Sequence, residues 1–108
     1  MKIIAFIAVC LLAVSTASLW AGAKENWDTN CMQCHGKTGS ADTKMGKKLN
    51  AKDLTDAKTQ AGFTDADAAK AIKEGMKEDG KLVMKAFGDK LNNDEIKALV
   101  TYVRSLKK

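Results

Sequence analysis

Residues 31–35 of this chain read Cys-Met-Gln-Cys-His, and no other segment limits the possible folds as strongly. Two residues separate the thiols, so both can face the same side of a helical turn, and the imidazole follows at once. This Cys-x-x-Cys-His spacing is the one by which a polypeptide is joined covalently to haem c. The thiols can reach the two vinyl groups of one porphyrin. We therefore expect Cys31 and Cys34 to form thioether bonds to one haem, with His35 as the proximal iron ligand.

Two other kinds of site also contain a Cys-x-x-Cys pair. A structural zinc site needs two further ligands, yet the chain has no histidine besides His35 and no third cysteine besides Cys10. A dithiol oxidoreductase needs a strand before the motif and a parallel sheet around it. No β-α-β pattern surrounds Cys31. Haem attachment is therefore the favoured interpretation, and the dithiol oxidoreductase is kept as a distant alternative.

Residues 1–23 have the features of a cleaved signal peptide. Lys2 supplies a positive start, residues 3–14 are almost wholly apolar, and Ala21-Gly22-Ala23 fits a small-x-small cleavage site. Cleavage after Ala17 is an alternative. The apolar run is shorter than the roughly 20 residues of a membrane span, so an uncleaved anchor is the minor alternative. We expect export to the periplasm and a single haem domain formed by residues 24–108.

The helical patterns predict an all-α domain. A first helix is expected over residues 24–35, a second from the capping pair Thr64 and Asp67 to a stop at Gly75, and a last helix from Asn92 onwards. The last helix carries an apolar stripe at helical spacing, formed by Ile96, Leu99, Val100, Val103 and Leu106. Residues 36–46 and 76–91 are expected to be loops, and no segment alternates for long enough to predict a strand. A domain this small has a limited core, so we expect three to five short helices to wrap around the haem and the haem-free chain to be largely unfolded.

The residues alone leave the second axial ligand open between methionine, lysine, water and an empty position. Met32 lies between the cysteines, too close to reach the opposite haem face, and Met45 is expected on the proximal side. Met76 ends a predicted helix, where a structural role is equally compatible. Met84 lies in the long loop, which can cover the far face of the haem.

With these methionines, the sequence resembles the class I c-type cytochromes, the family of small bacterial monohaem cytochromes c. The resemblance rests on Cys31–Gly36, Met84–Gly88, Leu91–Ile96 and Tyr102–Arg104. It implies a cytochrome c-like fold around one haem, with His35 proximal and Met84 distal. Family members usually have proline after the distal methionine, where this chain has Lys85, and that change removes a rigid turn. They also orient the proximal histidine through a loop carbonyl, which here would come from near Gly46 or Lys47.

Charge and side-chain chemistry then limit the function. The net charge is +5, but the positive residues are scattered, which argues against a nucleic-acid partner. No nucleophile–base pair or pair of catalytic carboxylates is evident, so we expect an electron-transfer protein and not an enzyme. Larger redox proteins would be its electron donor and acceptor, and we expect a monomer without stable membrane insertion. The alternative is a five-coordinate haem protein that binds gas or reduces peroxide.

Overall fold

The computed structural model describes residues 21–108. A first helical segment runs from Ala21 to His35. It contains a π-helical turn, η1 (Trp27–Cys31), followed by α2 (Met32–His35). In η1 the Met32 N–H donates to the Trp27 carbonyl five residues back, so the helix widens where the haem motif begins. The expected first helix is therefore confirmed, and the signal-peptide prediction lies mostly outside the described residues.

The remaining helices begin at side-chain caps. They are α3 (Lys44–Lys48), α4 (Ala57–Ala61), α5 (Asp65–Glu74) and α6 (Asn93–Ser105). Thr64 and Asp67 form the expected capping box of α5, and Asn92 and Glu95 form that of α6. Gly75 ends α5 with a φ of 77°. The helix α4 was not expected, and the loop after the haem motif ends at Thr43 because α3 starts there.

Residues 76–84 correct the expectation of an extended loop. They form an antiparallel hairpin of β1 (Met76–Glu78) and β2 (Lys81–Met84). Its two-residue turn is Asp79-Gly80, and both residues have positive φ, at 50° and 77°. Asp-Gly is a favoured sequence for such a turn because both positions need φ above zero. The prediction that the chain has no strand was therefore wrong for this short segment, although the fold is otherwise helical.

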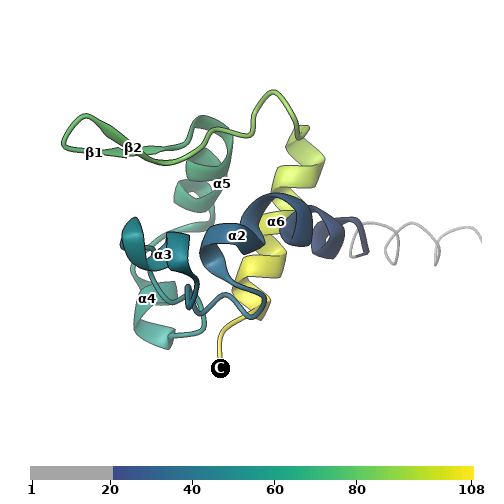
Figure 1. The fold of residues 1–108 in the computed structure, drawn as a ribbon. Coiled ribbons are helices and arrows are strands. Elements are labelled where there is room, and N and C mark those ends of the chain that lie inside the picture. Colours follow the sequence, from purple (N-terminus) through teal and green to yellow (C-terminus); the bar gives the residue numbers. More distant parts are fainter. Residues whose placement is uncertain (1–20) are drawn as a thin grey trace, which may run out of the picture.

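The first helix crosses α6, and the hairpin extends from the top of α5 toward the side of the molecule where α3 lies (Figure 1). Helix α5 packs against α6, and α2 packs against α3. The core lies between these helices and contains Trp27, Cys31, Ile72, Phe87, Leu91, Ile96, Leu99, Val100 and Val103. We call these nine residues the core cluster. Within residues 21–108, no helix has both the length and the apolar character that membrane crossing would require.

A polar network ties the end of α6 to α4 and to the start of α5. Arg104 donates from Nη2 to the Phe63 carbonyl at 2.7 Å and from Nε to Asp65 Oδ1 at 2.8 Å. Its guanidinium also lies 4.4 Å from the centre of the Phe63 ring. The buried Gln60 donates to the carbonyls of Leu54 and Val103, at 2.7 and 2.8 Å. These contacts hold α6 in place from the side away from the hairpin.

Candidate haem site

The three predicted donors of the haem motif lie at the end of the first helix. Cys31 is buried in the core cluster, whereas Cys34 and His35 are half-buried. Cys31 and Cys34 are not joined to each other by a disulfide. Burial, with a smaller contribution from neighbouring Cys34, raises the pKa of the Cys31 thiol to about 11.

The Nδ1 atom of the His35 imidazole is buried without a hydrogen-bond partner. Burial also lowers the pKa of His35, because the charged form loses its hydration. A neutral imidazole is the form that binds iron. Two thiols separated by two residues, followed directly by a neutral imidazole, fit the donor set of a covalently attached haem.

A carbonyl near Gly46 or Lys47 was expected to accept a hydrogen bond from the His35 ring. The structure has no such bond, because Nδ1 has no hydrogen-bond partner. In this segment α3 instead contacts the backbone of the motif. Thr43 Oγ1 donates to the Cys34 carbonyl at 2.8 Å and accepts from the Gly46 N–H at 2.8 Å. The predicted acceptor is therefore wrong, because Thr43 holds α3 to the main chain of Cys34 and not to the imidazole of His35.

Trp27 is the side chain that restricts the His35 ring. The two ring centroids lie 5.7 Å apart, and the Trp27 indole N–H donates to the Gly36 carbonyl at 3.1 Å. On its other side Trp27 contacts Tyr102 of α6, with ring centroids 5.4 Å apart. Trp27 is 1% exposed. A buried aromatic residue thus holds the histidine and the residue after it against the last helix.

The close approach of α3 to the motif requires a glycine at position 46. A Cβ atom there would clash with the Cys34 carbonyl oxygen and would lie 2.7 Å from the Ala41 carbonyl oxygen. Glycine is needed at this position because there is no space for a Cβ atom, and not because of its φ angle or a turn. Thr43 was not recognised as a site residue in the sequence, and Gly46 was considered only for its carbonyl, because their role depends on a contact between two helices.

We expect Gly46→Ala to destabilise the protein by about 1–3 kcal/mol, the usual cost of adding a methyl group to a filled site. Denaturant unfolding of the haem-loaded protein measures this cost. Gly62→Ala is the matched control, because its Cβ would lie 3.4 Å from the nearest atom and should change stability by less than about 0.5 kcal/mol. Equal stability of the two variants would show that the contact between α3 and the motif tolerates a side chain.

The expected distal residue, Met84, is the last residue of β2. It is half-buried and packs against the core cluster. The core cluster therefore links Met84 to Cys31, although the two residues are far apart in the sequence. Met32 also packs against this cluster, and Met45 lines a pocket of about 310 Å³ beside the motif, together with Gln33, Lys44 and Lys48.

Comparisons with known proteins agree with this arrangement. The family model for "Cytochrome C oxidase, cbb3-type, subunit III" matches residues 18–103. Among solved structures, the KustC0563 c-type cytochrome is 36% identical, with a TM-score of 0.71 over 80% of this chain and 98% of its own. A single-site variant of Kustc0563 is 35% identical, with a TM-score of 0.69 over 80% of this chain and 99% of its own.

No protein of curated function is a significant match. The family match nevertheless extends over most of the described residues, and the similar structures are covered almost completely. These findings confirm the expected cytochrome c-like fold and the expected cofactor. The chain belongs to the small monohaem class I c-type cytochromes, which are electron carriers with a covalently attached haem c.

Proposed function

We propose that this cytochrome is a periplasmic one-electron carrier between larger redox proteins, and not an enzyme. In this proposal Cys31 and Cys34 hold the haem by thioether bonds, His35 is the proximal ligand and Met84 is the distal ligand. When bound, the haem supplies one iron centre that alternates between the ferrous and ferric states. A histidine and methionine pair raises the reduction potential, because the neutral thioether favours ferrous iron.

The observation that carries this proposal is the position of Met84 relative to the motif. Cys31 is a buried member of the core cluster, and Met84 packs against the same cluster from the hairpin. Trp27, a member of that cluster, contacts the His35 ring. The cluster connects the motif to Met84. This connection supports the proposal that the two lie on opposite faces of one haem.

The thiol chemistry argues against the dithiol alternative. In dithiol oxidoreductases the attacking cysteine has a lowered pKa, which makes the thiolate available near neutral pH. The pKa of Cys31 is raised to about 11 by burial. The motif also ends a helix and is not preceded by a strand within the described residues. These properties suit a cysteine that is permanently bonded to a cofactor.

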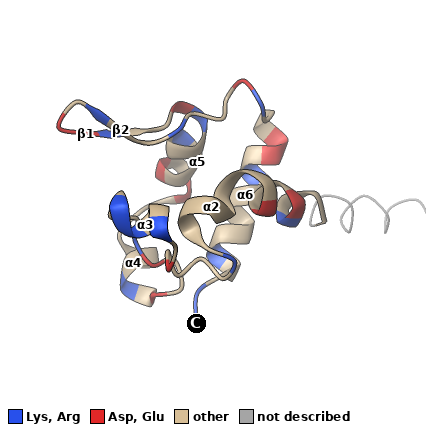
Figure 2. Cartoon of the chain, viewed as in Figure 1, with Lys and Arg blue, Asp and Glu red and all other residues tan. Residues whose placement is uncertain are grey.

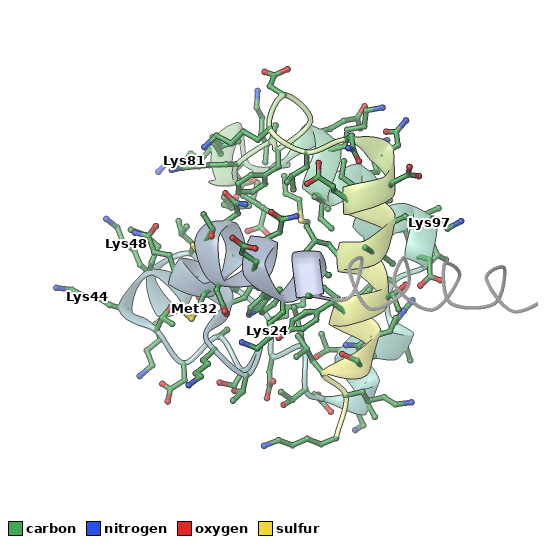
Figure 3. The ribbon with its side chains drawn as sticks, turned by 90° about the vertical axis from the view of Figure 1, so that its right-hand side faces the viewer. Lys24, Met32, Lys44, Lys48, Lys81 and Lys97 are labelled. Carbon is green, nitrogen blue, oxygen red and sulfur yellow. The ribbon has the colours of Figure 1, made fainter. Side chains whose placement is uncertain are left out.

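The charge distribution supports a protein partner with an acidic surface. Lys44, Lys47 and Lys48 are exposed on α3 beside the motif, where Figure 2 shows positive charge on most of the helix. Lys44, Lys48 and Lys81 extend to the same side of the molecule, away from α6 (Figure 3). Asp42 offsets one of these charges through an exposed ion pair with Lys47 at 3.1 Å. Such a surface speeds the encounter with an acidic partner, and more so at low salt.

Visible spectra of the purified protein in both oxidation states test the proposal. We expect a six-coordinate low-spin spectrum and the long-wavelength ferric band that marks a bond from thioether sulfur to iron. The reduced protein should not bind carbon monoxide, because both axial positions are filled. Mass spectrometry should find one haem per chain.

A high-spin spectrum that changes on addition of carbon monoxide would contradict the carrier and favour the gas-binding or peroxide-reducing alternative. A mass equal to that of the bare polypeptide would contradict the haem attachment itself. Cell fractionation tests the location separately, since a periplasmic protein appears in the osmotic-shock fraction.

A further inference from the structure

The hairpin places a second methionine beside Met84. In the register of β1 and β2, Met76 is the partner of Met84. Directly opposed residues of an antiparallel pair have their Cα atoms about 4.5–5.5 Å apart, and their side chains leave the same face of the ladder. The hairpin therefore presents two thioethers together.

This pairing lies at the base of the hairpin and is fixed by the backbone. Gly75 precedes Met76 with a φ of 77°, and a Cβ atom there would lie 2.6 Å from the Met84 carbonyl oxygen. The same Cβ would lie 3.0 Å from the Ala86 N–H nitrogen. The glycine thus lets the chain before Met76 lie directly against the chain after Met84. An irregularity in the ladder follows immediately, between Met76 and Lys77. Such bulges redirect side chains next to binding sites.

The two methionines differ in packing and not in chemistry. Met84 is half-buried and packs against the core cluster, whereas Met76 is 47% exposed. Met76 has three rotatable side-chain bonds and is not among the residues packed against the core cluster, so it can move toward the position of Met84 at low cost. The lysines of the same segment, Lys81 and Lys85, are also exposed. An ammonium group must lose its proton before it can bind iron, while a thioether needs no such step.

We propose that Met76 is a reserve thioether ligand that binds the haem iron when Met84 does not. This inference rests on the proposed ligation by Met84. The hairpin then carries two alternative sulfur ligands. It therefore maintains the same kind of distal ligand, and hence similar redox properties, when Met84 is lost.

The test uses the haem-loaded protein with Met84→Leu, Met76→Leu and the double substitution. Leucine keeps the volume of methionine and removes the sulfur. We expect Met76→Leu to leave the long-wavelength ferric band unchanged and Met84→Leu to retain it at neutral pH. The double variant should lose this band and bind carbon monoxide. Proton NMR of the reduced protein gives a second readout, because an iron-bound methionine methyl group is shifted strongly upfield.

The matched control combines Met84→Leu with Met45→Leu, which removes a half-buried methionine of α3 and should keep the band. Circular dichroism checks that each variant is folded, and Met84→Ala replaces Met84→Leu if that variant is not. Loss of the band in Met84→Leu alone, or its persistence in the double variant, would overturn the proposal. Absence of the band from the unsubstituted protein would instead refute ligation by Met84, so failure of the proposed function is recognised before any variant is made.

Discussion

Replacing Cys31 and Cys34 together by alanine is expected to remove the covalent haem and most of the helical circular dichroism. Cys31 belongs to the core cluster, and Cys34 and His35 are half-buried beside it. A domain of this size buries too little apolar surface for a large margin of stability. A cofactor that occupies the centre of the core then contributes its binding free energy to folding, as metals do in small metalloproteins. Helix content, followed in the far ultraviolet, measures the effect.

Gln33→Ala is the matched control for this experiment. Gln33 lies in the same pentapeptide, but its side chain is exposed, so the variant should keep both the haem and its helices. Full native helicity in the double cysteine variant would contradict the expected coupling between haem attachment and folding. Loss of helicity in Gln33→Ala would show that the segment is sensitive to any substitution.

Trp27→Ala is expected to destabilise the haem-loaded protein by about 3–5 kcal/mol, the usual cost of removing a buried aromatic side chain. Such a loss is a large part of the roughly 5–15 kcal/mol that stabilises a typical domain. Trp27 is among the most completely buried side chains, and its ring contacts both His35 and Tyr102. Guanidinium unfolding, followed by haem absorbance, measures the difference.

Trp27→Phe separates packing from hydrogen bonding at the same position. Phenylalanine keeps an aromatic ring between His35 and Tyr102 but has no N–H to donate to the Gly36 carbonyl. The Gly36 carbonyl keeps its hydrogen bond from the Gly39 N–H at 3.3 Å. The variant should therefore lose only about 0.5–1.5 kcal/mol, the usual contribution of one hydrogen bond, and lie between the unsubstituted protein and Trp27→Ala. If Trp27 orients the proximal ligand, both variants should also shift the reduction potential. Unchanged potentials would leave Trp27 with a role in stability alone.

Local sequence signals predicted the parts of the structure that depend on few residues. The helices α5 and α6 begin where Thr64 and Asn92 predict, because a capping box is complete within four residues. The haem motif is equally local, so the sequence was enough to identify the family and the cofactor. The assignments of Cys31, Cys34, His35 and Met84 as individual haem-binding residues stay predictions.

Features that depend on contacts between distant segments were missed. Arg104 and Gln60 join α6 to α4, and neither residue has a pattern in its own neighbourhood that indicates a partner. The hairpin was missed for another reason. Its turn signal, Asp79-Gly80, is present. However, the three residues of β1 are all exposed, and they show no alternation of apolar and polar residues that would predict a strand. The acceptor expected for His35 was wrong because the family's proline-containing loop is replaced here by α3, which Thr43 holds to the backbone.

Tertiary contacts are distributed unevenly between the tip of the hairpin and the rest of the molecule. The tip of the hairpin contributes no member to the core cluster, while Arg104 and Gln60 hold the opposite end of the molecule. Amide hydrogens near Asp79 should therefore exchange by local opening, well before those of α6. Mutations at the tip of the hairpin can accordingly accumulate without loss of the fold. Over evolutionary time, the tip can change in sequence while Met84 and the helical scaffold stay the same.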